Sequence, residues 1–155
     1  MRRLRLVIDT NVLLVSIGRQ SKYNWLFQAF LNEEFDLLVT TPILLEYHEK
    51  IAERTQPIIA ENILKLILAK SNVIKVDVTY KWHIIVADPD DDAFADCAFA
   101  GNADYLISND GHFDILKTID FPFIRLIKLD EFQTLFLKLK GKNTEGVFLM
   151  MNGER

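Results

Sequence analysis

Short apolar runs alternate with amphipathic segments along most of this chain, and this alternation limits the folds open to it. Residues 4–8 (LRLVI), 35–40 (FDLLVT), 103–108 (ADYLIS) and 123–128 (FIRLIK) have the length and apolar content of buried strands. Residues 72–78 (NVIKVDV) predict a further extended stretch. Strands separated by helices form βαβ units, so the sequence predicts an α/β fold with a parallel sheet covered on both faces.

The segments between these runs predict helices, because their apolar residues recur at helical spacing. They span residues 23–34, 41–54, 57–70 and 130–140, and a further helix begins at residues 88–92 (DPDDD). Thr41 is expected to cap the second helix with Pro42 at its first position, and Asp130 to cap the last. Residues 9–22 form a gap between the predicted elements.

Composition bounds the class of protein. The 155 residues are 50% hydrophobic, which suits one globular domain with a single core. The net charge of −4 supplies no strong positive field for binding nucleic acid. It does not exclude a nucleic-acid substrate, because a few acids in one cleft would account for the whole negative excess. Cys97 is the only cysteine, which favours a reducing compartment. With no signal peptide and no long uncharged apolar run, we expect a soluble, cytoplasmic protein without a membrane partner.

Two acids follow predicted strands directly. Asp9 comes after residues 4–8, and Asp110 comes two residues after 103–108. Parallel sheets bind ligands at the carboxyl ends of their strands, so both acids should lie at the opening of the sheet. A carboxylate placed there is desolvated and needs donors or a cation, although a structural turn at the strand end would also satisfy it.

The run DPDDD concentrates four carboxylates in five positions, and their repulsion needs a compensating positive group. Asp91 lies three and four residues before Phe94 and Ala95, which should face the core, so Asp91 should share that side of the helix. Asp92 should point elsewhere.

Simpler interpretations remain open for the other acids. Asp88 or Asp90 as a helix N-cap would explain part of the run. Glu46 lies on its own helix and could face either the sheet or solvent, and spacing alone does not decide between them.

Taken together, four stretches resemble the PIN-domain family. They are DTNVL (9–13), TPILLEY (41–47), DPDDDAFADCAFAGNADYLISND (88–110) and DGHFDIL (110–116), in the family's order and spacing. The resemblance covers about residues 4–137 and is closest to small prokaryotic proteins assigned as toxins of toxin-antitoxin systems. It implies a three-layer α/β/α sandwich, Rossmann-like, around a parallel sheet. It also implies a Mg²⁺- or Mn²⁺-dependent endoribonuclease that cleaves single-stranded RNA.

The resemblance also assigns site residues by position. The family's acids fall on Asp9, Glu46, Asp91 and Asp110. Asp9, Asp91 and Asp110 would bind the metal, with Asp92 the alternative to Asp91, and Glu46 would position water or act as general base. Asn11 and Ser108 match polar positions that hold carboxylates or the metal's water. Mg²⁺ and Mn²⁺ prefer such oxygen ligands. The single cysteine and the three histidines show no zinc-ligand spacing.

Two features depart from the family pattern. His112 stands where many relatives carry another acid, and it could contact phosphate or make a local hydrogen bond. Residues 139–155 extend beyond the nuclease domain expected at 1–138. In this extension Gly141, Gly146 and Gly153 should break any long helix, and VFLMM should pack on the same domain or on a second subunit as a homo-oligomer.

Two other functional classes stay open from the sequence. The domain could be a catalytically degenerate PIN-like module for RNA binding or assembly. Alternatively, the acids could form a phosphotransfer site with Lys128 at a later strand end, but that assignment leaves Glu46 without a role. A toxin function would further require an antitoxin partner encoded beside this chain.

Overall fold

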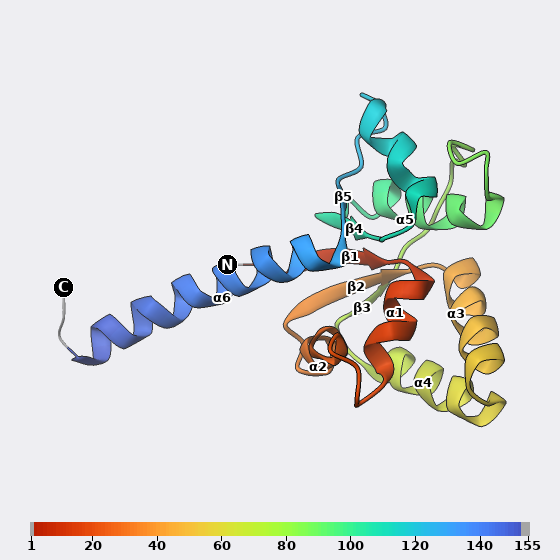
Figure 1. Ribbon diagram of the computed structural model, residues 1–155. Helices are drawn as coiled ribbons and strands as arrows, with labels where there is room; N and C mark the ends of the chain where they lie inside the picture. The colour runs from red at the N-terminus through yellow and green to blue at the C-terminus, as the bar shows by residue number, and fades with distance from the viewer. Residues whose placement is uncertain (1, 153–155) are drawn as a thin grey trace.

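The computed structural model describes the backbone of residues 2–152 and the side chains of residues 2–141. Its centre is a five-stranded parallel sheet in the order β3-β2-β1-β4-β5 (Figure 1). The strands are β1 (Leu4–Ile8), β2 (Phe35–Val39), β3 (Val73–Lys75), β4 (Tyr105–Ile107) and β5 (Leu126–Ile127). The predicted parallel sheet is therefore confirmed, with the first strand at its middle.

Helices cover the sheet on both sides. They are α1 (Thr10–Ile17), α2 (Asn24–Leu31), α3 (Thr41–Arg54), α4 (Pro57–Ala69), α5 (Asp92–Ala100) and α6 (Leu129–Asn152), with 3-10 turns η1 (Pro89–Asp91) and η2 (Gly111–Thr118). In Figure 1, α1, α3 and α4 lie below the sheet, and α5 lies above it. The α/β/α sandwich expected from the resemblance is confirmed.

Helix α1 follows Asp9 directly, in a stretch for which no element was predicted. Two predicted helix caps were wrong. The cap of α3 is Thr40 and not Thr41, since the Thr40 hydroxyl accepts from the Ile43 amide at 3.3 Å. Helix α6 begins at Leu129, which leaves Asp130 in its first turn and not at its cap. These shifts of one residue follow from backbone geometry that capping preference alone does not fix.

The close approach of α5 to the sheet depends on a glycine. A Cβ at Gly101, just after α5, would lie 2.8 Å from both Leu38 Cδ1 and Val76 Cγ2. Phe94 and Cys97 of α5 are fully buried, and burial raises the pKa of the Cys97 thiol to about 12. Helix α5 is thus fixed against the sheet, and its first residues are held near the ends of the strands.

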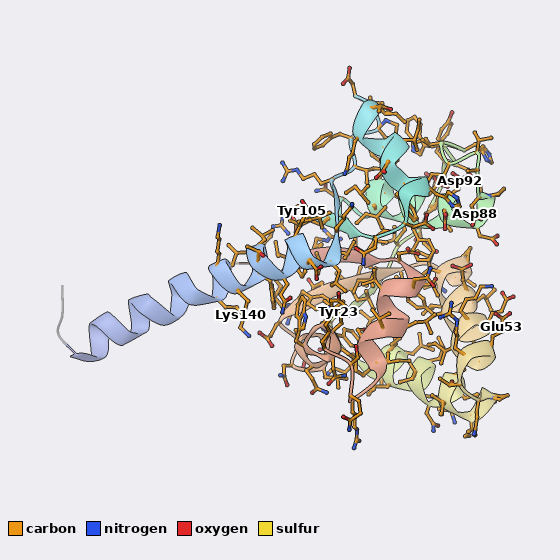
Figure 2. All side chains as sticks on the ribbon, viewed as in Figure 1. Tyr23, Glu53, Asp88, Asp92, Tyr105 and Lys140 are labelled. Atoms are coloured by element: carbon orange, nitrogen blue, oxygen red, sulfur yellow. The ribbon has the colours of Figure 1, made fainter. Side chains whose placement is uncertain are left out.

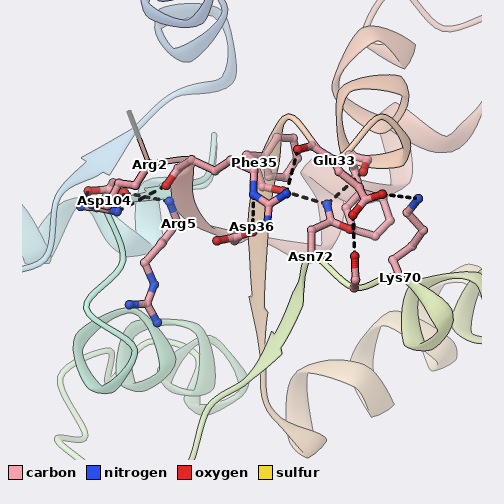
Figure 3. Close-up of polar contacts among 11 residues, drawn as sticks. Arg2, Arg5, Glu33, Phe35, Asp36, Lys70, Asn72 and Asp104 are labelled. Atoms are coloured by element: carbon pink, nitrogen blue, oxygen red, sulfur yellow. Dashed lines mark hydrogen bonds and ion pairs between the residues drawn. The ribbon is translucent and has the colours of Figure 1, made fainter.

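A polar network closes the opposite, amino-terminal end of the sheet (Figure 3). Arg2 pairs with both carboxylate oxygens of Asp104 at 3.0 and 2.8 Å, and the Arg5 amide donates to the same carboxylate. Asn72 donates to the carbonyls of Phe30 and Phe35. The N-terminal arginines therefore lie at the other end of β1 from Asp9.

Helix α6 packs on the domain through its first half. Trp25 stacks on Phe132 and Phe136, with ring centroids 6.3 and 6.2 Å apart. Lys140, labelled on the helix in Figure 2, pairs with Glu34 at 2.7 Å. The helix then projects away from the body (Figure 1). Within the described residues, no helix combines the length and apolarity needed to cross a membrane.

The glycines of the extension do not have the predicted effect. Helix α6 continues through Gly141 and Gly146 to Asn152, so the predicted break at these positions is wrong. A single glycine inside a helix costs only about 1 kcal/mol relative to alanine, which flanking helix formers can offset. Gly153 lies outside the described residues. The domain boundary at residue 138 remains a proposal.

Candidate active site

Asp9 lies at the end of β1, and neighbouring groups surround its carboxylate. The residue is only 4% exposed, its amide donates to the Ile107 carbonyl at 3.0 Å, and its Oδ2 accepts from the Ser108 hydroxyl at 2.8 Å. Burial, followed by the charges of Asp110 and Glu46, raises the pKa of Asp9 to about 6, although the bond from Ser108 lowers it. Asp9 therefore lies within the electrostatic reach of two other predicted site acids.

Ser108 also connects Asp9 with Asp110. Its hydroxyl oxygen accepts from the Asp110 amide at 3.0 Å while the hydroxyl donates to Asp9. Asp110 in turn is the N-cap of η2, and its Oδ1 accepts from the His112 amide at 2.9 Å. The structure thus places Ser108 where the sequence predicted a residue that holds carboxylates.

Glu46 faces the sheet, which settles the orientation that helical spacing left open. Its Oε2 accepts from the Thr10 hydroxyl at 2.6 Å. The adjacent Tyr47 is fully buried, and its phenol donates to the Ile8 carbonyl at 2.5 Å. Tyr47 therefore fixes α3 against the end of β1, and Thr10 draws the Glu46 carboxylate toward Asp9. The sequence pattern did not identify Thr10 as a site residue.

Asp91 is the third acid of the cluster. It is 6% exposed, and its buried Oδ2 has no hydrogen-bond partner. Burial, followed by the charges of Asp88, Asp9 and Asp110, raises its pKa to about 7. Asp91 thus shares one electrostatic environment with Asp9 and Asp110, as its position on the core-facing side predicted.

The neighbouring acids of DPDDD serve the local fold (Figure 2). Asp92 accepts from the Ile85 amide at 2.7 Å and so holds the segment before η1. Asp88 is the N-cap of η1, since its Oδ1 accepts from the Asp90 amide at 3.0 Å. The geometry therefore favours Asp91 over Asp92 as the site acid, and it confirms the capping interpretation for Asp88.

Asn11 does not join the cluster. The residue is exposed on α1, and among the described side chains no hydrogen bond or ion pair connects it with an acid. Its assignment as a residue that holds carboxylates or the metal's water gains no support from these contacts. Thr10, one position earlier, makes the contact that Asn11 was expected to make.

His112 lies between two of the acids. Its Nδ1 is 3.4 Å from Asp91 Oδ2 and 3.5 Å from Asp110 Oδ1. Donor atoms of Asp88, Asp91 and His112 all lie within 4.8 Å of one another, an arrangement that could hold a metal ion. His112 comes from a different segment of the chain than the two aspartates, so the argument from ligand spacing could not find this group.

A cavity of about 750 Å³ opens beside Glu46. Its walls come from the start of α3, the segment after β3 and the start of α5, and they carry both signs of charge. The ionisable lining residues are Glu46, Glu49, Lys75, Asp77, Lys81, His83, Asp90, Asp92 and Asp96. Glu46 belongs to this lining and also approaches Asp9 through its bond from Thr10.

Comparison with known proteins identifies the family. The model of the family described as PIN domain matches residues 5–112. Among solved structures, the chain is similar to VapBC2 from Rickettsia felis, solved bound to a DNA fragment from its promoter. The identity is 16% and the TM-score is 0.57, and the match covers 81% of this chain and 98% of that one.

A second solved structure is the PIN domain of RRP44 from T. brucei. It shows 10% identity and a TM-score of 0.54, with coverage of 94% of this chain and 87% of that one. At such identities the structural similarity establishes the fold alone. No match was found among curated proteins.

Proposed function

Because this chain belongs to the PIN-domain family, we propose that it is a divalent-metal-dependent endoribonuclease that hydrolyses phosphodiester bonds of single-stranded RNA. The proteins of this family are generally nucleases. The observation that carries the proposal is the meeting of Asp9, Asp91 and Asp110 at the carboxyl ends of β1 and β4, where burial and mutual repulsion raise the pKa of Asp9 and Asp91.

The donor set fits a hard divalent cation such as Mg²⁺ or Mn²⁺. Three carboxylates lie in one partly buried cluster, and the buried Asp91 Oδ2 has no hydrogen-bond partner. Asp9, Asp91 and Asp110 would hold the ion. When bound, such an ion polarises the scissile phosphodiester and lowers the pKa of a water beside it.

The remaining residues act on the reacting water and on the acids. Glu46, oriented by Thr10, accepts a proton from the water that attacks phosphorus. A new phosphorus–oxygen bond forms while the bond to the leaving ribose oxygen breaks, and that oxygen takes a proton from solvent. Ser108 keeps Asp9 and Asp110 at a fixed separation throughout.

The cavity beside Glu46 is the proposed path of the RNA strand. Lys75, Lys81 and His83 on its walls can contact phosphate oxygens. Because acids line the same walls, binding should be weak without metal and should rely on few phosphate contacts.

Cleavage of end-labelled RNA tests the proposal. The protein should cut a single-stranded oligoribonucleotide with Mg²⁺ or Mn²⁺, lose activity in EDTA and regain it when metal is restored. A duplex of the same sequence should be cut more slowly. RNA binding without cleavage under every metal condition would support the degenerate binding module instead, and cleavage that persists in EDTA would exclude the metal site.

A toxin role with an antitoxin partner is a further part of this proposal. It is supported by the motif resemblance and by the structural similarity to VapBC2. A short reading frame beside this gene, with a DNA-binding start and a disordered tail, would support it. Co-expression of that product should then inhibit the RNA cleavage described above.

A further inference from the structure

The imidazole of His112 is held at the edge of the acid cluster by the backbone. The His112 amide donates to Asp110 Oδ1 at 2.9 Å in the first turn of η2, which fixes the position from which the side chain extends. Its Nδ1 lies 3.4 Å from Asp91 Oδ2 and 3.5 Å from Asp110 Oδ1. The imidazole thus faces two carboxylates, while 48% of its side chain remains exposed to solvent.

Asp91 provides an independent indication of a ligand. Its Oδ2 is buried without a hydrogen-bond partner, and the nearest cationic group is His112 Nδ1 at 3.4 Å. A buried carboxylate oxygen in this state is unfavourable unless a cation or donor reaches it. Asp88 contributes another carboxylate to the same space, with donor atoms of all three residues within 4.8 Å of one another.

We propose that Asp88, Asp91 and His112 form a mixed nitrogen–oxygen site that selects a transition-metal ion of the Mn²⁺ class over Mg²⁺. Mg²⁺ gains little from an imidazole, whereas the affinity of the first-row transition ions for a mixed nitrogen–oxygen site rises along the row from Mn²⁺ onward. The site shares Asp91 with the proposed nuclease centre, so its biological role rests on the proposed nuclease function. Its preference for one metal over another can be measured on the protein alone, without RNA.

Metal binding to the full-length apoprotein tests this inference, with no RNA present. Titration calorimetry with Mn²⁺ and with Mg²⁺ should be carried out on the wild type, on His112→Asn and on the matched control His83→Asn. His83 is also a histidine beside an acid, 4.0 Å from Asp92 Oδ2, but it lies outside the cluster. Circular dichroism confirms that each variant is folded.

The wild type should bind Mn²⁺ more tightly than Mg²⁺. His112→Asn should lower the Mn²⁺ affinity by about tenfold or more while the Mg²⁺ affinity changes little, because only the nitrogen donor is lost. His83→Asn should leave both affinities unchanged. Pulsed electron paramagnetic resonance of bound Mn²⁺ should show nitrogen coupling in the wild type and in His83→Asn, and none in His112→Asn.

Two results would overturn the inference: absence of nitrogen coupling in the wild type, or an equal effect of His112→Asn on both metals. The latter would make His112 an ordinary ion-pair partner of the acids. Failure of the nuclease proposal gives a different pattern, in which His112-dependent Mn²⁺ binding is observed but RNA is not cut.

Discussion

Ser108 donates its hydroxyl to Asp9 Oδ2 at 2.8 Å, and this bond joins the carboxyl ends of the neighbouring strands β1 and β4. The same hydroxyl accepts from the Asp110 amide, so one side chain spaces two acids of the cluster. Without a cation, the acids are kept together by the fold and not by attraction. Repulsion among them should therefore be measurable in the stability of the metal-free protein.

Neutralising Asp91 should stabilise the metal-free protein. Asp91→Asn removes a buried charge that Asp88, Asp9 and Asp110 repel, so the free energy of unfolding in EDTA at pH 8 should rise by about 0.5–2 kcal/mol. Urea denaturation measures the change. Asp92→Asn is the control, because its amide oxygen can still accept from Ile85 and its stability should change little. Substantial destabilisation by Asp91→Asn would show that its charge is compensated.

Stability of the metal-free protein should decrease as pH rises. The pKa values of Asp9 and Asp91 are raised to about 6 and about 7, against about 4 in an unfolded chain. Between the unfolded and the native pKa values, the native state binds more protons than the unfolded state. The free energy of unfolding therefore falls as the pH rises through this window. A loss of roughly 1–3 kcal/mol is expected from pH 5 to pH 8.

Melting curves in EDTA and in saturating Mn²⁺ test this pH dependence. Mn²⁺ should reduce or reverse the loss, because it binds the ionised carboxylates of the native state. Asp104 has a lowered pKa, so it changes the free energy of unfolding only at pH values below 5 and does not affect this comparison. A stability that increases from pH 5 to pH 8 in EDTA would contradict the raised pKa values.

Thr10 should matter for the chemical step and not for metal binding. Thr10→Val keeps the shape of the side chain but removes the hydroxyl that donates to Glu46, so kcat for RNA should fall by about tenfold or more. Calorimetry should show unchanged Mn²⁺ affinity. Thr134→Val, on α6, removes a hydroxyl that contacts only the Asp130 carbonyl and should have no effect on kcat. Equal kcat values for the two variants would exclude a positioning role.

The extension should be dispensable for cleavage. Phe132 and Phe136 of α6 are buried, so a chain that ends after Leu139 keeps their core contacts and loses the Lys140–Glu34 pair near the cut. It should fold and cut RNA but differ in oligomeric state or solubility, as measured by light scattering. Failure to fold would assign the extension to the core and contradict the domain boundary.

Parts of this site could be predicted from the sequence because they depend on local periodicity. Asp9 and Asp110 were placed correctly, since each follows an apolar run that forms a central strand. The preference for Asp91 over Asp92 came from helical spacing relative to Phe94, and the structure has Asp91 buried and Asp92 bonded to Ile85.

Other parts depend on tertiary contacts that no local pattern encodes. The orientation of Glu46 is set by Thr10, which lies 36 positions earlier in the chain. The place of His112 beside Asp91 depends on how η2 packs against the start of α5. The continuous helix α6 was missed because two glycines were given more weight than the helix formers around them.

Cleavage by the two neighbouring acid variants tests the central claim most directly. Wild type, Asp91→Asn and Asp92→Asn should be assayed on the same labelled single-stranded RNA, each with Mn²⁺ and with EDTA. With Mn²⁺, Asp91→Asn should cut slower by a factor on the order of 10² or more, while Asp92→Asn should stay close to wild type. None should cut in EDTA. If Asp92→Asn loses activity instead, or if neither variant does, the acid cluster around Asp91 is not the nuclease site.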